Sequence, residues 1–172
     1  MIVAVDVDYR ESEVVAAAVG FASWTDAHTT VEVVVTSDAP AAPYQPGRFY
    51  LRELPHLLGV LALLVPPLDA IVIDGYVWLD GAHAIPGLGA HLYDALGGTV
   101  PVLGIAKTAF AGASAIEVVR GESARPLYVT TVGVAATAAA EHVRAMHGDY
   151  RIPTLLKRVD QLCRENASAN AR

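Results

Sequence analysis

The chain has 172 residues, of which 53% are hydrophobic and 17% are charged, and its formal net charge is −6. This composition fits one globular domain with a full-sized core, and it excludes a disordered chain. The acidic balance argues against a protein that coats nucleic acid without selectivity, because such proteins are usually basic.

The cysteine count and the hydropathy pattern indicate the compartment. Cys163 is the only cysteine, so the chain can form no internal disulfide, which fits a reducing environment. Residues 57–68 are apolar but too short to span a bilayer, and residues 1–8 lack the basic start of a secretory signal. We therefore expect a cytoplasmic protein that does not contact membranes, and we favour a monomer.

The first part of the chain predicts three short strands joined by tight turns, which is typical of an antiparallel meander. The strands are expected at residues 2–8, 14–24 and 29–36. A Pro-rich loop follows at 40–47, and apolar residues at helical spacing predict a helix over 48–64.

The rest of the chain alternates strands with helices. Strands are expected at residues 70–74, 100–106, 115–119 and 126–130, and helices at 87–96, 135–146 and 155–165. Residues 75–86 are interpreted as a loop and residues 166–172 as a frayed tail. Residues 1–165 are thus expected to form a single α/β domain, a mixed sheet flanked by helices in the layout of the ribonuclease H-like fold.

The apolar run of residues 68–73 ends abruptly in Asp74. A buried parallel strand of this kind delivers its carboxylate to the edge of the sheet, where open α/β folds place their chemistry. In the expected topology the first strand brings Asp6 beside Asp74, and Glu53 lies near both from the preceding helix. Three carboxylates at one point repel each other unless a cation joins them, and oxygen ligands select Mg²⁺ or Mn²⁺. The alternative for each acid alone is an ordinary exposed side chain.

A second group of motifs carries a family resemblance. The segment Pro43-Tyr44-Gln45-Pro46-Gly47, followed by Phe49 and Leu51-Arg52-Glu53, resembles the endonuclease V family, which has Pro-Tyr-x-Pro-Gly and then Phe-Arg-Glu. Further segments match in the family's order, at residues 4–10, 69–75, 87–92, 104–107, 126–129 and 151–153. Each motif is weak alone, but the ordered set is specific and covers most of the chain.

The resemblance implies a metal-dependent endonuclease of the ribonuclease H-like fold. Such an enzyme uses Mg²⁺, for which Mn²⁺ may substitute, and cuts DNA or RNA at deaminated adenine (inosine) during repair. The cut falls at the second phosphodiester on the 3′ side. Asp6, Glu53 and Asp74 match the family's metal-binding acids, and Lys107 matches a lysine near the scissile phosphate.

The resemblance also implies which residues contact the nucleic acid. Tyr44 matches an aromatic wedge that fills the gap when the inosine base turns out. Extruding a base costs a few kcal/mol, and stacking an aromatic in its place recovers about 1–3 kcal/mol. The other expected contacts are Pro46, Gly47, Gly75, His83 and His91.

Two segments depart from the family pattern. Residues 76–83 replace a turn and a His-Pro pair, and His83 is the candidate counterpart of that histidine. After Tyr128-Val129-Thr130 the family has Pro-Gly-His, and this His is expected to complete the metal environment, but Gly133 stands at its position. Two alternatives therefore stay open: a catalytically silent relative that binds nucleic acid or a protein partner, and a metal-dependent hydrolase of another phosphate substrate.

Overall fold

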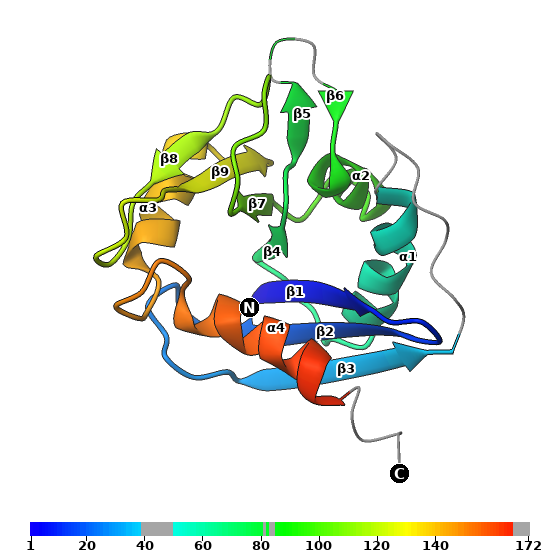
Figure 1. Cartoon of the computed structure of the whole chain (residues 1–172). Helices are drawn as coiled ribbons and strands as arrows, with labels where there is room; N and C mark the ends of the chain where they lie inside the picture. Colours follow the sequence, from blue (N-terminus) through cyan, green and yellow to red (C-terminus); the bar gives the residue numbers. More distant parts are fainter. Residues whose placement is uncertain (39–49, 81, 83–84, 167–172) are drawn as a thin grey trace.

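The computed structural model describes residues 1–38, 50–80, 82 and 85–166, and a seven-stranded sheet forms its centre. The strands are β1 (Ile2–Tyr9), β2 (Val14–Phe21), β3 (Val31–Ser37), β4 (Ala70–Asp74), β7 (Val102–Ala106), β8 (Ile116–Val118) and β9 (Leu127–Val132). The shorter strands β5 (Trp78–Asp80) and β6 (Ile85–Pro86) pair with each other. The helices are α1 (Tyr50–Leu61), α2 (Leu88–Ala95), α3 (Ala136–Ala145) and α4 (Thr154–Asn166) (Figure 1).

The strands follow the spatial order β3-β2-β1-β4-β7-β9-β8. β1, β2 and β3 form the predicted antiparallel meander. β4 joins β1 in parallel and β7 joins β4 in parallel, whereas β9 and β8 close the sheet with antiparallel pairs. The expectation that the first and fourth strands are neighbours is therefore confirmed.

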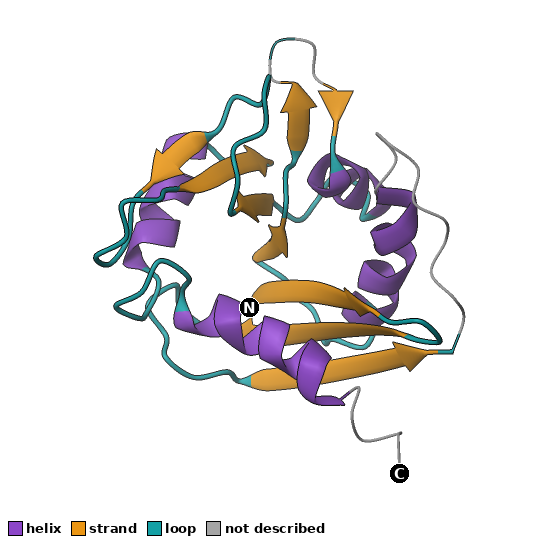
Figure 2. Cartoon of the chain, in the orientation of Figure 1, coloured by secondary structure: helices purple, strands orange, loops and turns teal. Residues whose placement is uncertain are grey.

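Helices cover both faces of the sheet (Figure 2). On one face α1 and α2 pack on the sheet, and Leu57 meets Ile71 in their core cluster. On the other face α3 and α4 pack on it, and Val159 belongs to the same cluster as Val72. Ile71 and Val72 are consecutive residues of β4 that point to opposite faces, as the alternation of a strand requires. The near-continuous apolar sequence of the central strands follows from this burial on both sides.

Three boundaries differ from the sequence-based expectations. The second strand ends at Phe21 and not near residue 24, because Asp26 Oδ2 accepts hydrogen bonds from the N–H groups of Ala22 and Ser23 and turns the chain. Residues 75–86 are not all loop, since they contain β5 and β6. Asn166 belongs to α4, and the remainder of the expected tail, 167–172, lies outside the described residues.

Among the described residues, no helix has the length and apolarity needed to cross a membrane.

Candidate active site

Asp74 ends β4 and lies beside Asp6, which is in the middle of β1, and the next strand leads into a lysine. Val5 of β1 pairs with Ile73 of β4, so the residues that follow them, Asp6 and Asp74, lie side by side. β7 is the next strand beyond β4, and Lys107 follows it directly. The Lys107 Nζ donates to the Asp74 Oδ2 at 2.5 Å. The topology thus brings together three of the four predicted catalytic residues.

Glu53 approaches the same place from the first turn of α1. Burial, aided by the charges of Asp6 and Asp74, raises the pKa of Glu53 to about 8. Burial also raises the pKa of Asp6 to about 6, with the charge of Asp74 as a further cause, although the Val7 N–H donates to Asp6 and opposes the shift. A cation shared by these carboxyl groups would relieve both the burial of their charges and their mutual repulsion.

The oxygen donors of these acids suit a hard divalent cation such as Mg²⁺ or Mn²⁺. Within the part of the chain that the structure describes, no group of three or more His, Cys, Asp and Glu side chains is arranged to hold a metal ion. Asp74 instead pairs with the Lys107 ammonium. The donor set therefore fits the cation by its chemistry, and gathering Asp6, Glu53 and Asp74 around one ion requires these side chains to come closer together than in this structure.

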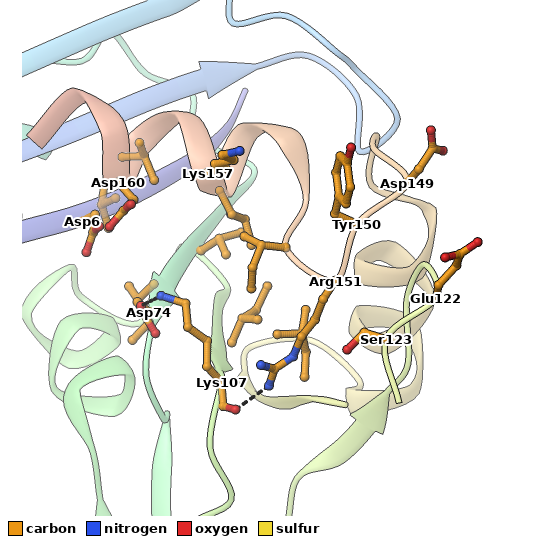
Figure 3. A pocket seen from close by; sticks show the side chains of 18 residues that line it. Asp6, Asp74, Lys107, Glu122, Ser123, Asp149, Tyr150, Arg151, Lys157 and Asp160 are labelled. Atoms are coloured by element: carbon orange, nitrogen blue, oxygen red, sulfur yellow. Dashed lines mark hydrogen bonds and ion pairs between the residues drawn. The ribbon is translucent and has the colours of Figure 1, made fainter. Parts of the chain in front are cut away.

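Asp160 of α4 is a further carboxylate of this site, which the sequence pattern did not reveal. It lines the same pocket as Asp6, Asp74 and Lys107 (Figure 3). Its charge is one of the causes that raise the pKa of Asp6. The available signal was its place next to Val159, where an acid borders the buried stripe of an amphipathic helix.

The surroundings of Glu53 come from β1 and α1. The Arg52 guanidinium carbon lies 3.9 Å from the centroid of the Tyr9 ring, and His56 meets that ring edge-on at 6.5 Å between centroids. Burial and the charge of Glu53 raise the pKa of Tyr9, so its phenol stays protonated beside the carboxyl group. These contacts hold the start of α1 against the end of β1 and fix the position of Glu53.

The residues predicted to contact nucleic acid are described only in part. Those outside the described residues are Tyr44, Pro46, Gly47 and His83. His91 of α2 stacks on Tyr50 at the start of α1, with 3.5 Å between ring centroids and 21° between planes. The His91 ring is therefore placed where α1 begins, directly after the Pro-rich segment in the chain.

Gly75 follows Asp74 with a φ of 128°, a conformation that residues with a side chain rarely adopt. A Cβ at Gly75 would meet no atom within 4 Å, so the backbone beside the acid borders open space. The carbonyl of Gly75 lies so close to Gly104 of β7 that a Cβ there would stand 2.6 Å from its oxygen. Gly104 thus accommodates the backbone after Asp74, and Gly75 leaves open space next to that acid.

The position of the missing family histidine corrects the expectation that a histidine there would complete the metal environment. β9 runs antiparallel to β7, with Val132 opposite Val102 at the start of β7. Gly133 therefore lies beside Pro101, at the far end of β7 from Lys107 and roughly 20 Å away at about 3.3 Å per strand residue. A histidine at this position would not reach the acids, so its absence removes no ligand from them.

A cavity of about 760 Å³ extends from the acids along α4. Asp6, Asp74 and Asp160 gather at one end of it, and Tyr150 lies near the other (Figure 3). Between these ends the walls come from the strand ends of β4 and β7, from the turn after β8 and from the segment that joins α3 to α4. The acidic site is therefore one end of a longer cavity.

Comparison with known proteins identifies the family of the chain. The sequence profile of the Endonuclease V family matches residues 1–137. Endonuclease V of Streptomyces avermitilis is 35% identical over an alignment that covers 93% of this chain and 77% of the relative. Endonuclease V of Streptomyces coelicolor is 34% identical, with 93% and 76% covered.

Solved structures agree as well. A crystal structure of Endonuclease V from Streptomyces avermitilis has a TM-score of 0.80 and 29% identity, and covers 99% of this chain and 82% of its own. Endonuclease V of Ciona intestinalis, solved with a DNA that contains inosine followed by a ribo-adenosine, has a TM-score of 0.80 at 16% identity, with 97% and 85% covered. The predicted ribonuclease H-like fold is confirmed, and the chain belongs to the Endonuclease V family.

Proposed function

We propose that this chain is a metal-dependent endonuclease that cuts DNA or RNA at the second phosphodiester on the 3′ side of inosine, as a step of nucleic-acid repair. The observation that carries the proposal is the meeting of Asp6 in β1, Asp74 at the end of β4 and Lys107 directly after β7, on three adjoining strands. Membership of the Endonuclease V family supports the reaction. The inosine-containing DNA bound by the Ciona relative supports the substrate.

Asp6, Glu53 and Asp74 would hold Mg²⁺, for which Mn²⁺ can substitute, and Asp160 borders the same place. When bound, the cation supplies a nucleophilic water and neutralises charge at the phosphate. The protein's share of the work is to fix the oxygen donors on rigid elements before substrate arrives, so that no reorganisation is needed during the reaction. β1 and β4 do this for two of the acids through their backbone pairing.

Lys107 would contribute a positive charge at the scissile phosphate. Its side chain is half exposed and reaches Asp74 through its ammonium. When Asp74 turns to the cation, the Lys107 Nζ is free to donate a charge-assisted hydrogen bond to a non-bridging phosphate oxygen. The backbone of Lys107 stays fixed meanwhile, because its carbonyl accepts a hydrogen bond from the Arg151 guanidinium.

Recognition of the inosine would lie on the α1 side of the acids. By family resemblance Tyr44 acts as the wedge, and Pro46, Gly47 and His83 contact the strand. The open space beside Gly75 and the placement of His91 against the start of α1 support contacts from these two residues.

Cleavage of an end-labelled strand that carries one inosine tests the proposal. With Mg²⁺ or Mn²⁺, the wild type is expected to release one product, cut one nucleotide beyond the inosine, and to leave a matched adenine strand intact. Asp74→Asn is expected to lose at least about a thousandfold in rate, because it removes a charged ligand of the cation. No cleavage by wild-type protein with either metal, at high enzyme concentration, would refute the proposal.

The same experiment decides between this proposal and the two alternatives. A catalytically silent relative, which binds nucleic acid or a protein partner, leaves the inosine strand intact with both metals. A hydrolase of another phosphate substrate leaves the strand intact but turns over in a panel of phosphate esters. The position of Gly133, far from the acids, takes away the motivation that the missing histidine gave to the silent relative.

A further inference from the structure

The cavity beside the acids is larger than a metal site needs. Its volume of about 760 Å³ falls in the range of small-molecule sites, roughly 300–1,000 Å³. The acids occupy one end, and the remainder has apolar walls contributed by Ile105, Leu127, Ile152, Leu156 and Val159. An apolar slot that opens directly onto a phosphodiesterase centre suits the flat face of a nucleobase.

Polar groups are distributed along this cavity in a definite order (Figure 3). Lys107 stands next to the acids, and Lys157 projects from α4 on the neighbouring wall, so both can meet a phosphate near the acidic end. Glu122, Ser123 and Asp149 line the opposite end. Carboxylates at that end repel a phosphate but accept hydrogen bonds from the N–H groups of a base. Because Asp6, Asp74 and Asp160 repel a phosphate as well, it is the ammonium groups of Lys107 and Lys157 that orient a nucleotide with its phosphate towards the acidic end.

The aromatic ring of Tyr150 lies at the end of the cavity away from the acidic site. Tyr150 lines the cavity and is 77% exposed, which is unusual for a large aromatic side chain. Exposed aromatics at the mouth of a nucleic-acid site serve as stacking platforms, and each stacked base contributes about 1–3 kcal/mol by alanine substitution.

Two arginines hold the cavity wall in place. Arg120 is 7% exposed, and its guanidinium donates to the carbonyls of Met146, Gly148 and Tyr150. Arg151 donates to the carbonyl of Lys107 and, at 2.8 Å, to that of Pro126. The segment between α3 and α4 is thereby fixed to the ends of β7 and β9. A wall fixed in this way presents a preformed site, which lowers the entropic cost of binding.

The path of the strand indicates which nucleotide enters. The Pro-rich segment with Tyr44 leads directly into α1, and α1 lies on the face of the sheet opposite α4 (Figure 1). A strand with its inosine on the α1 side and its scissile phosphate at the acids must continue towards α4. The cavity then receives the nucleotide that follows the cut.

From these observations we infer that the cavity between α4 and the segment joining α3 to α4 binds the 5′-phosphorylated nucleotide of the leaving strand, the second nucleotide on the 3′ side of inosine. Its phosphate lies near Lys107 and Lys157, and its base lies between the apolar walls and Tyr150. This assignment of the nucleotide rests on the proposed function, whereas the binding of a 5′-phosphorylated nucleotide in the cavity does not.

Equilibrium binding of short strands without inosine tests the inference. The probes are a 5′-phosphorylated trinucleotide, the same trinucleotide without the phosphate, and a 5′-phosphorylated trinucleotide whose first nucleotide is abasic. Leu156→Trp fills the cavity, and Tyr150→Ala removes an exposed ring whose loss does not threaten folding. Leu63→Trp is the matched control, because Leu63 is 60% exposed and does not line the cavity.

Wild-type protein and Leu63→Trp are expected to bind the phosphorylated trinucleotide at least about tenfold more tightly than either other probe, the size expected for one base contact. Leu156→Trp and Tyr150→Ala are expected to bind the phosphorylated trinucleotide about tenfold more weakly than the wild type and no better than the abasic probe, since the base contact is lost only once. Both variants should keep the preference for the 5′-phosphate, because Lys107 and Lys157 are unchanged. Equal affinity of wild type and both variants for the phosphorylated trinucleotide would overturn the inference.

Cleavage of the inosine strand, measured in parallel, tests the proposed function separately from the nucleotide site. Binding that depends on Leu156 and Tyr150 without any inosine cleavage supports the nucleotide site and refutes the proposed function. Inosine cleavage with probe affinities unchanged in both variants overturns the nucleotide site and leaves the proposed function standing.

Discussion

Asp6 and Asp74 stand side by side because the residues before them, Val5 and Ile73, are paired in neighbouring parallel strands. β1 is paired on its other side with β2, so a slip of one residue would break two ladders and turn the buried residues of β1 to the wrong face. The distance between these two acids is therefore set by backbone hydrogen bonds and core burial, and not by a loop.

Metal binding is expected to depend on the acids at this edge of the sheet. Titration calorimetry with Mn²⁺ should show binding to the wild type that is lost in Asp6→Asn and in Glu53→Gln, and weakened in Asp160→Asn. Asp69→Asn is the matched control, because Asp69 precedes the opposite end of β4 and pairs with the Met1 amino group. Binding that survives in both Asp6→Asn and Glu53→Gln would place the ion elsewhere.

The stability of the protein in chelator is expected to fall as the pH rises from 5 to 8. Burial raises the folded-state pKa of Asp6 to about 6 and that of Glu53 to about 8, above the ordinary values of these acids. The folded state therefore binds more protons than the unfolded state in this window, and its free energy of unfolding decreases with pH. One unit of pKa shift corresponds to about 1.4 kcal/mol, and most of both shifts acts within this window, so a decrease of roughly 5 kcal/mol is expected.

Urea unfolding at both pH values measures this effect. Glu53→Gln carries no titrating group at that position and should flatten the dependence, whereas Glu165→Gln, on the exposed side of α4, should leave it unchanged. A free energy of unfolding that rises between pH 5 and pH 8 would contradict the burial of these carboxyl groups.

Gly104→Ala is expected to destabilise the protein by about 1–3 kcal/mol and to lower its activity. The added Cβ would stand 2.6 Å from the Gly75 carbonyl oxygen and 2.9 Å from the Val77 nitrogen, and backbone atoms cannot rotate away. The displaced segment is the one that follows Asp74, so rate and stability should fall together.

Gly59→Ala is the matched control for this substitution. Gly59 is an exposed residue of α1, and a Cβ there meets no atom within 4 Å. Replacing a helical glycine of this kind by alanine should stabilise the protein by about 0.5–1 kcal/mol. The midpoint of thermal unfolding should therefore fall for Gly104→Ala and rise for Gly59→Ala. A midpoint that rises in both variants would show that Gly104 tolerates a side chain.

Arg120→Met is expected to cost at least about 2 kcal/mol, because it leaves buried carbonyl groups without their donor. The carbonyls concerned belong to the segment between α3 and α4. Amide hydrogen exchange should become faster in the segment between α3 and α4. It should stay unchanged in β2, which β1 separates from β4. Arg125→Met, at an exposed position in the turn before β9, should alter neither quantity; an equal cost in both variants would refute the anchoring role.

Much of the site was predictable because strand ends leave a clear pattern. Asp74 terminates an apolar run, and the element order placed Asp6 beside it and Lys107 on the next strand, all as the structure has them. The position of Glu53 followed from the helix that precedes β4. An apolar run that ends in a charged residue is visible in the sequence because a buried strand has to be apolar until it reaches the edge of the sheet.

Asp160 escaped prediction for a physical reason. An acid in an amphipathic helix is normally assigned to the solvent, and its place next to Val159 shows that it borders the buried stripe but not that α4 packs on β1 and β2. That packing is a tertiary relationship, and periodicity along one helix does not encode it. The pair β5 and β6 was missed for a related reason, because strands of three and two residues are too short to show alternation.

Arg151 and Lys107 connect the wall of the cavity to the acidic site. The Arg151 guanidinium holds the carbonyl of Lys107, while the ammonium of the same lysine holds Asp74. The segment after α3 is therefore connected through Lys107 to Asp74 on β4. A substitution of Arg151 is therefore expected to loosen the cavity wall and the Lys107 backbone together, because one guanidinium holds the carbonyls of both Pro126 and Lys107.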